Sequence, residues 1–247
     1  MTTYAVVLAA GKGTRMKSDL AKVLHRAAGR PLITWTLDAL EPLTIDRTIV
    51  VVGHQAEEVR DVLPAGVESV LQEPQLGTGH AVMVAIPNIH PEEGDRVLVI
   101  PGDMPLIRSE SLRRLIDLHE STRAAATMLT AAFDDPQAYG RVVRNSAGDV
   151  VAIVEARDAT TEQLAIREVN TSVYVFDTPS LRDALDEIRP DNDQGEFYLT
   201  DVIGILVGQG RTVAATAVDD PGEGHGVNTI AELEAAGAQL IQRRGAI

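Results

Sequence analysis

Short apolar runs alternate with segments of helical periodicity through the first half of this 247-residue chain. Each run is five or six residues long, which suits a buried strand, and each intervening segment suits one helix. Such alternation predicts βαβ units, whose strands lie parallel in one sheet with helices on its faces. We expect strands at 4–9, 48–52, 67–71 and 96–100, and helices at 31–40, 55–63, 79–86 and 109–121.

The second half departs from strict alternation. The sequence NSAGD at 145–149 is typical of a hairpin turn. Ser109 and Thr178 are predicted to cap helices, and Thr229 with Glu232 has the pattern of a capping box. We expect strands at 126–133, 150–155, 169–176 and 212–218, and helices at 197–207 and 229–243. The whole pattern predicts an α/β, Rossmann-like fold with a mixed, mostly parallel sheet flanked by helices, in a single domain spanning 1–247.

Composition excludes several classes of protein. The chain has no cysteine, which excludes disulfides, thiol nucleophiles and thiolate metal sites. It has no apolar stretch long enough to span a membrane and no signal peptide, so we expect a cytoplasmic protein that binds no membrane. The formal net charge of −14 argues against a general nucleic-acid partner, because such proteins neutralise phosphates with positive surface.

The positive charge is concentrated in the stretch LAAGKGTRMKSDLAKVLH, at 8–25. Residues 1–30 hold six Lys or Arg and one acidic residue. Gly11 and Gly13 allow the main chain after the first strand to approach a phosphate, and Arg15 and Lys22 add cations suited to phosphate oxygens. The spacing matches neither a Walker A loop nor a dinucleotide fingerprint. The stretch therefore predicts a polyphosphate-binding loop, with a solvated basic face or a structural turn as the alternatives.

An acidic residue follows the fourth predicted strand. Asp103 comes directly after Gly102, so its carboxylate should reach the same carboxyl edge of the sheet as the glycine-rich loop. A carboxylate among phosphates suits Mg²⁺, which takes few protein ligands together with water and phosphate oxygens. The structural alternative is that Asp103 caps the turn before Pro105.

Eight blocks in order along the chain resemble the sugar-nucleotidyltransferases. Within that family they resemble the uridylyltransferase (pyrophosphorylase) domain of bacterial bifunctional N-acetylglucosamine-1-phosphate uridyltransferases. The blocks are LAAGKGTRM with AKVLH, LQEPQLGTGHA, PGDMPLI, DDPQAYGRVVR, IVEARDAT, EVNTS, DQGEFYLTD and GVN. Because they are colinear and cover nearly the whole chain, together they are far more specific than any one of them.

The resemblance implies transfer of the uridylyl group of UTP to N-acetylglucosamine 1-phosphate, with Mg²⁺ as cofactor and pyrophosphate as the second product. It implies a nucleotide-binding half at about 1–125 and a sugar-phosphate-binding half at about 126–247. It implies Arg15 and Lys22 as the catalytic cations and Asp103 with Asn228 as the metal ligands. The implied nucleotide contacts are Leu8, Ala9, Ala10, Gly11, Gln72, Gly77 and Thr78. The implied sugar contacts are Gly140, Glu155, Asn170 and Thr171.

The chain also departs from the family pattern. Ala21, Pro101 and Ser172 replace residues that the family usually has as proline, tyrosine and glycine, and Thr229-Ile230 replaces Asn-Arg. Several of these positions border the implied sugar site. Two other functions therefore stay open: a related transferase with another nucleotide or sugar phosphate, and a non-catalytic sugar-nucleotide-binding protein. His80 is expected to pack rather than to catalyse, because a sugar phosphate is already ionised and needs no general base.

The family's bifunctional members continue into a hexapeptide-repeat domain that transfers acetyl groups. This chain contains no such repeat, so we expect it to lack acetyltransferase activity. The resemblance implies no partner protein.

Overall fold

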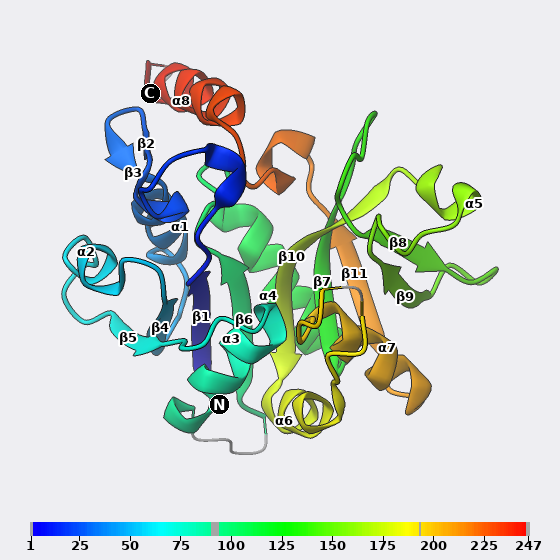
Figure 1. Cartoon of the computed structure of the whole chain (residues 1–247). Helices are drawn as coiled ribbons and strands as arrows, with labels where there is room; N and C mark the ends of the chain where they lie inside the picture. The colour runs from blue at the N-terminus through cyan, green and yellow to red at the C-terminus, as the bar shows by residue number, and fades with distance from the viewer. Residues whose placement is uncertain (1, 90–93, 193, 246–247) are drawn as a thin grey trace.

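The computed structural model describes residues 2–89, 94–192 and 194–245. Within these residues a nine-stranded mixed sheet forms the centre of the molecule, with helices on both faces (Figure 1). Seven strands form its main path in the order β11-β7-β10-β6-β1-β4-β5, and β8 and β9 extend it beside β10. This arrangement confirms the prediction of a mixed, mostly parallel sheet flanked by helices.

All strands of the sheet except β8 lie close to the predicted apolar runs. They are β1 (Thr3–Ala9), β4 (Arg47–Val52), β5 (Glu68–Leu71), β6 (Arg96–Pro101), β7 (Ala126–Ala132), β8 (Arg141–Arg144), β9 (Val150–Val154), β10 (Glu168–Asp177) and β11 (Val213–Ala217). Strand β1 pairs in parallel with β4 and β6, and β7 pairs in parallel with β11. Strand β10 runs antiparallel to β6 and β7, so the start of β10 lies at the carboxyl edge of the parallel strands.

Two layers of helices bury the two faces of the sheet. The α-helices of the described residues, of which α5 and α8 lie outside these layers, are α1 (Leu32–Leu40), α2 (Ala56–Arg60), α3 (Thr78–Ala85), α4 (Ser109–Thr122), α5 (Thr161–Leu164), α6 (Thr178–Glu187), α7 (Thr200–Gly208) and α8 (Ile230–Gly245). Alternate residues of the central strands point to opposite faces, so Val7 of β1 packs toward α1 and α4 while Val6 packs toward α3, α6 and α7. Both faces are apolar because both are covered.

A third, smaller cluster attaches the end of the chain to its beginning. Helix α8 packs on a short hairpin of β2 (Arg26–Ala27) and β3 (Arg30–Pro31) through Ala27, Ala236 and Leu240. The Trp35 ring lies between the guanidinium groups of Arg30 and Arg244, whose carbons are 4.6 and 4.5 Å from its centroid. The 3-10 helices among the described residues are η1 (Thr14–Met16), η2 (Lys22–Leu24), η3 (Ile86–Asn88) and η4 (Pro221–Gly224).

Two predicted helix N-caps are wrong, although both helices begin at the predicted positions. Ser109 does not cap α4, because its hydroxyl donates to the Ala39 carbonyl oxygen at 2.8 Å and so ties α4 to α1. Thr178 does not cap α6 either. The carboxylate of Asp177 does so by accepting the Ser180 N–H at 3.1 Å, an arrangement favoured at a helix N-terminus.

The other local predictions have mixed outcomes. The hairpin turn at 145–149 is confirmed between β8 and β9. The capping box of Thr229 and Glu232 is confirmed by reciprocal hydrogen bonds of 2.9 and 3.2 Å. Strand β8 and helix α5 were missed, since each has only four residues and too short a pattern to detect.

None of the helices among the described residues has the length and apolar character that crossing a membrane requires.

One histidine of the fold is buried, and its burial outweighs the charges around it. His119 faces inward from α4, is 6% exposed, and its Nδ1 lies 3.0 Å from the Thr127 hydroxyl of β7. Burial lowers the pKa of His119 to about 4. The Asp177 and Glu120 carboxylates oppose that shift and Arg96 adds to it. The ring is therefore neutral in the folded protein at pH values where an unfolded histidine takes up a proton.

We expect this histidine to make the protein less stable in mild acid. Between pH 6.5 and about 4 the unfolded chain binds the extra proton, so the free energy of unfolding falls as pH is lowered through that window. The contribution is at most about 3 kcal/mol. The measurement is urea unfolding of wild type and His119→Gln between pH 4 and 7. The variant should show a smaller loss, and parallel pH profiles for the two proteins would contradict the assignment.

Candidate active site

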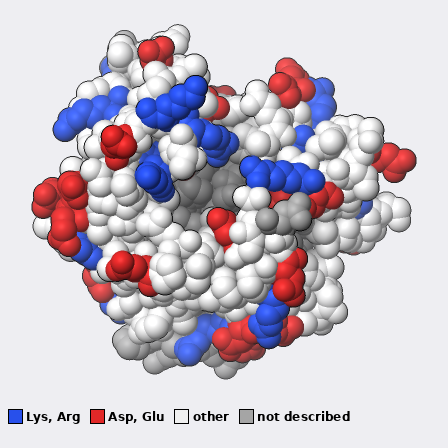
Figure 2. All heavy atoms as spheres, viewed as in Figure 1, with Lys and Arg blue, Asp and Glu red and all other residues white. Residues whose placement is uncertain are grey.

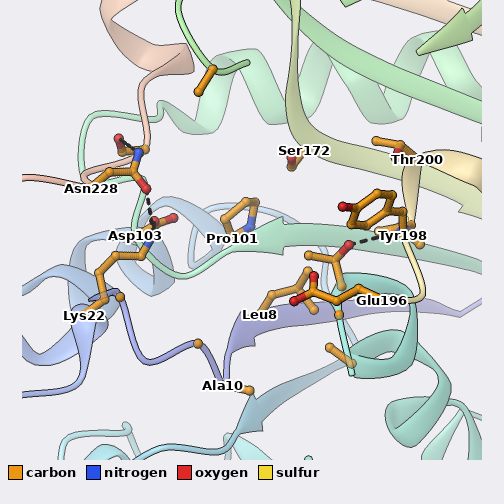
Figure 3. A pocket seen from close by; sticks show the side chains of 18 of the residues that line it. Leu8, Ala10, Lys22, Pro101, Asp103, Ser172, Glu196, Tyr198, Thr200 and Asn228 are labelled. Atoms are coloured by element: carbon orange, nitrogen blue, oxygen red, sulfur yellow. Dashed lines mark hydrogen bonds and ion pairs between the residues drawn. The ribbon is translucent and has the colours of Figure 1, made fainter. Parts of the chain in front are cut away.

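A cleft of about 750 Å³ opens at the carboxyl edge of the sheet. Residues from both halves of the chain line it, from Leu8 at the end of β1 to Asn228 before α8. In Figure 3 Lys22, Asp103 and Asn228 lie on one side of the cleft, and Glu196, Tyr198 and Thr200 lie on the other. Lys and Arg side chains gather around the hollow in the surface (Figure 2). The cations lining it are Lys12, Arg15, Lys22 and Arg157.

The glycine-rich loop forms the floor of the cleft. Hydrogen bonds hold the backbone around it: the Gly102 N–H donates to the Leu8 carbonyl at 2.9 Å, and the His54 N–H donates to the Ala10 carbonyl at 3.2 Å. The glycine-rich loop and the turn that carries Asp103 are therefore joined at the point where β1 and β6 end side by side. Leu8, Ala9, Ala10 and Gly11, which the resemblance implies as nucleotide contacts, all line the cleft.

Two cationic side chains and two side chains with acceptor oxygens meet on one side of the cleft. The Lys22 ammonium forms an ion pair with the Asp103 carboxylate and donates to Asn228 Oδ1 at 3.0 Å. Arg15 donates to the same Asn228 oxygen at 2.7 Å. Asp103 is 6% exposed, so its charge is largely removed from bulk water. The structure thus brings together four predicted residues that lie up to 213 positions apart in the sequence.

The side chain of Asn228 is held with its oxygen toward the cations. Its Nδ2 donates to the Gly226 carbonyl at 2.9 Å, and its backbone N–H donates to the Glu232 carboxylate at 2.6 Å. The Val227 N–H in turn donates to the Asp103 carbonyl at 2.9 Å. These contacts fix the amide orientation, so Asn228 presents an oxygen, which is the atom that a hard cation prefers.

At another part of the cleft, Gln72 is held by the loop that follows it. Its Nε2 donates to the Gly77 carbonyl at 2.9 Å and lies 3.1 Å from His80 Nδ1. Since a carbonyl only accepts, the amide nitrogen must face Gly77, and Gln72 can offer a ligand in the cleft only its Oε1 acceptor. His80 thus positions the glutamine, which agrees with its expected packing role.

The start of α7 closes over this loop. The Thr78 hydroxyl accepts the Leu199 N–H at 3.1 Å, and the Phe197 N–H donates to the Leu76 carbonyl at 2.8 Å. These bonds use the backbone of 197–199, so α7 begins at Thr200 and not at the predicted 197. A side chain at Gly77 would lie 2.6 Å from the Phe197 carbonyl oxygen, and Gly77 has φ +106°, which explains the glycine there.

Glu155 lines the cleft on the side formed by the second half of the chain. Its carboxylate accepts from the Thr200 hydroxyl at 3.3 Å, and burial raises its pKa above the usual range while that hydroxyl opposes the shift. Burial raises the pKa of Tyr139 to about 12, so its hydroxyl keeps its proton near neutral pH. That hydroxyl accepts the Gly226 N–H at 3.1 Å, which leaves its own hydrogen free to donate.

Two of the predicted sugar contacts lie just behind the cleft wall. Gly140 backs onto Glu155, since a side chain there would be 3.5 Å from the Glu155 carboxylate oxygen. Asn170 accepts the Ser172 N–H at 3.0 Å through its Oδ1, at the bulge where β10 shifts register. Ser172 itself has φ +62° and lines the cleft beside Thr171, whose hydroxyl donates to the Leu129 carbonyl at 2.7 Å. Gly140 and Asn170 therefore shape the wall, while Glu155 and Thr171 form its surface.

Sequence reasoning missed several residues of the cleft. Tyr139 and Arg157 lie inside blocks that were recognised, but neither was selected as a site residue. The block DQGEFYLTD was quoted without any site residue, although Glu196, Tyr198 and Thr200 line the cleft. The alternation of apolar runs carries no signal for them because they precede or open α7 and act only through its docking.

The described side chains around the cleft do not form a metal site made of protein ligands alone. Within the described residues no group of three or more histidine or acidic side chains could hold a metal ion. Asp103 and Asn228 nevertheless bring two oxygen donors close enough to share the Lys22 ammonium. One carboxylate and one amide oxygen beside an open cleft fit Mg²⁺, which completes its octahedron with water and phosphate oxygens.

Comparison with known proteins gives the same result from sequence and from structure. The model of one protein family, described as "MobA-like NTP transferase domain", matches residues 5–197 of this chain. The chain is 49% identical over 243 residues to the bifunctional protein GlmU of Exiguobacterium sibiricum, which covers 98% of this chain and 54% of that protein. It is 48% identical over 244 residues to bifunctional GlmU of Streptococcus gordonii, covering 99% and 52%. The chain thus spans about half the length of these relatives.

A solved structure of a UDP-glucose pyrophosphorylase complexed with UDP-glucose superposes with a TM-score of 0.79 at 16% identity, covering 98% of this chain and all of that one. At this identity the superposition shows a shared fold. With the family match over 193 consecutive residues and the GlmU relatives, it leads to one conclusion. The chain belongs to the MobA-like NTP transferase domain family.

Proposed function

We propose that this chain transfers the uridylyl group of UTP to N-acetylglucosamine 1-phosphate, giving UDP-N-acetylglucosamine and pyrophosphate. The observation that carries the proposal is the meeting of Arg15, Lys22, Asp103 and Asn228 at one side of a cleft large enough for a nucleotide. The similarity to GlmU proteins supports this reaction over others of the family.

In this reaction an oxygen of the sugar phosphate attacks the α-phosphorus of UTP, and the bond from that phosphorus to the bridging oxygen breaks. The electron pair of the broken bond leaves with pyrophosphate. The attacking phosphate is already an anion, so no residue has to remove a proton. Two polyanions must meet, and the barrier is mainly one of charge and position.

The cations of the cleft meet that requirement. Lys22 lies at the Asp103–Asn228 pair and is half enclosed, so its charge acts in a medium that screens it less than water does. Arg15 lies nearer the solvent, next to the glycine-rich loop, where its planar group can hold the departing pyrophosphate. Lys22 then neutralises charge at the reacting phosphorus.

A magnesium ion held by Asp103 and Asn228 would supply further neutralisation of the phosphate charge. The two residues are suited to hold it, because both present an oxygen on the same side of the cleft. The neighbouring cations Arg15 and Lys22 offer no lone pairs, and the nearby Glu232 carboxylate already accepts the Asn228 and Thr229 N–H groups.

Gln72 supports a choice of uracil among the bases. Its available Oε1 accepts a hydrogen bond from a ring N–H such as that of uracil. Cytosine presents an acceptor nitrogen at that position, so the two acceptors would face each other in a buried place. For the sugar, Glu155 can accept from ring hydroxyls and Tyr139 can donate to an acceptor oxygen.

A substrate panel tests the proposed reaction. We expect pyrophosphate release with Mg²⁺ to be fastest for UTP and N-acetylglucosamine 1-phosphate. CTP should be slower in kcat/KM by about 10 to 100-fold, the cost of leaving a buried acceptor unpaired. The assay compares UTP, CTP, GTP and dTTP with several sugar 1-phosphates. A preference for another pair would replace this proposal with a related transferase. Tight binding of a UDP-sugar without turnover would favour a sugar-nucleotide-binding protein.

Another prediction compares two lysines, Lys22 at the start of η2 and Lys17 directly after η1. Lys22→Met should lower kcat by about 10² to 10³-fold, by analogy with the loss of one transition-state donor. Lys17→Met makes the same exchange on a residue that does not line the cleft, and should change kcat by less than about twofold. Steady-state kinetics on both variants measures the difference, and equal losses in the two would refute the role of Lys22.

A third prediction concerns Asp103. Asp103→Ala should abolish turnover and still unfold cooperatively, because its carboxylate contacts Lys22 in the cleft and not the apolar core. Thermal unfolding followed by circular dichroism checks the fold and the pyrophosphate assay checks turnover. A variant that loses cooperative unfolding would show a structural task for Asp103 instead.

A further inference from the structure

The segment 219–228, here called the strap, connects β11 to α8 along the edge of the sheet where the cleft opens. It meets the segment that follows Asp103 at two places. At the first, the Val227 N–H donates to the Asp103 carbonyl at 2.9 Å, and a side chain at Gly226 would lie 3.4 Å from the Asp103 carboxylate. This meeting sets Asn228 beside Asp103.

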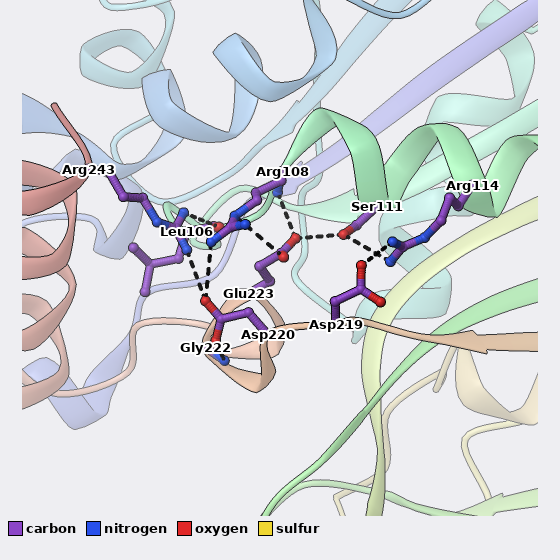
Figure 4. A network of polar contacts seen from close by, with 9 residues as sticks. All are labelled: Leu106, Arg108, Ser111, Arg114, Asp219, Asp220, Gly222, Glu223 and Arg243. Carbon is purple, nitrogen blue, oxygen red and sulfur yellow. Dashed lines mark hydrogen bonds and ion pairs between the residues drawn. The ribbon is translucent and has the colours of Figure 1, made fainter. Parts of the chain in front are cut away.

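The second meeting is made by a buried carboxylate. Glu223 is 1% exposed and accepts hydrogen bonds from the Ser111 hydroxyl at 2.7 Å and the Arg108 N–H at 3.1 Å. The Arg108 guanidinium lies 3.5 Å from its other oxygen. Figure 4 shows Glu223 pointing from the strap to the start of α4, between Arg108 and Ser111. The strap is thus fastened to both ends of the segment 103–111.

The neighbouring ion pairs are of another kind. Asp220 pairs with Arg108 at 3.3 Å and with Arg243 at 3.5 Å, and Asp219 pairs with Arg114. Each has an acid that is 45% or more exposed, so water and salt screen these pairs. Burying a carboxylate is costly unless donors surround it, and removing its partners exposes that cost. Glu223 is therefore the anchor that holds the strap in one place.

Packing leaves the backbone between Glu223 and Asn228 little freedom to move. A side chain at Gly224 would lie 2.7 Å from Ala131, so the strap is pressed against β7. The His225 ring stacks on Phe133 with 4.0 Å between centroids. Five residue steps with both ends and the middle in contact cannot absorb a displacement, so a shift at Glu223 is passed on to Asn228.

We propose that Glu223 is a positioning residue for the cation site: by fastening the strap to the start of α4 it keeps Asn228 Oδ1 and the Asp103 carboxylate facing the same divalent ion. Glu223 itself touches neither ion nor substrate. The inference rests on the proposed function, in which Asp103 and Asn228 hold a divalent ion. Outer groups of this kind usually change metal affinity by about 10 to 100-fold when removed.

The test is Glu223→Gln, which keeps the shape but removes the charge and one acceptor. Binding of Mn²⁺ in the presence of UTP is measured by electron paramagnetic resonance, and binding of UTP in EDTA by calorimetry. We expect Mn²⁺ affinity to fall about tenfold and metal-free UTP affinity to stay within about twofold. Asp219→Asn is the matched control, because it removes an exposed carboxylate from the same strap and should change neither.

Ser111→Ala provides a second variant should Glu223→Gln not fold. It removes the 2.7 Å hydrogen bond and keeps the carboxylate, so Mn²⁺ affinity should fall in the same direction and by less. The inference would be overturned if Glu223→Gln folded and bound Mn²⁺ with wild-type affinity. If Glu223→Gln did not fold, wild-type Mn²⁺ affinity in Ser111→Ala would overturn it. An equal loss of metal-free UTP affinity would also overturn it, since the effect would then be general. Turnover of the wild type on the substrate panel reports separately on the proposed function.

Discussion

The cleft depends on one electrostatic constraint, which is that Asp103 and Asn228 share the Lys22 ammonium at the carboxyl edge of the sheet. A carboxylate this enclosed has to meet a cation, and Lys22 and Arg15 come from the loop that follows β1. The pairing of β1 with β6 puts loop and carboxylate side by side. The strap then brings the Asn228 oxygen to the same point. Charge balance and sheet topology together therefore define the place that we propose for a polyphosphate and a divalent ion.

Sheet topology also explains how the second half of the chain reaches this place. Strand β10 runs antiparallel to its neighbours, so its first residues lie where the parallel strands end. The bulge after Asn170 turns Ser172 into the cleft, and the β8–β9 hairpin carries Tyr139 and Glu155 at its two ends. A strictly parallel sheet would place these residues at the opposite edge. Strand β10, which is reversed relative to its neighbours β6 and β7, thus gives the cleft its second wall.

The alternation of apolar runs was enough to predict most strands and most helices, because burial on both faces demands those residues. It could not predict β8 and α5, which have only four residues each, or the true start of α7, which is set by hydrogen bonds to the segment around the start of α3. Of the candidate site, the loop, Lys22, Asp103, Gln72, Gly77, Thr78, Glu155, Thr171 and Asn228 line the cleft as expected. Gly140 and Asn170 lie behind its wall. A local sequence pattern does not reveal burial or contacts between residues 100 positions apart. Only the structure could therefore separate the residues that line the cleft from those behind its wall.

The residues themselves determine the chemical character of the cleft: glycines that admit phosphate, cations that neutralise it, and oxygen donors that suit a hard ion. Motif and spacing carry that information because it is local. The tertiary structure alone decides which of the polar groups meet. It orients Asn228 by its bond to Gly226, leaves Gln72 only an acceptor to offer, and buries Glu223 against the start of α4. These outcomes depend on segments brought together from far apart in the chain, where a hydrogen bond selects one orientation of a side chain that the sequence leaves free.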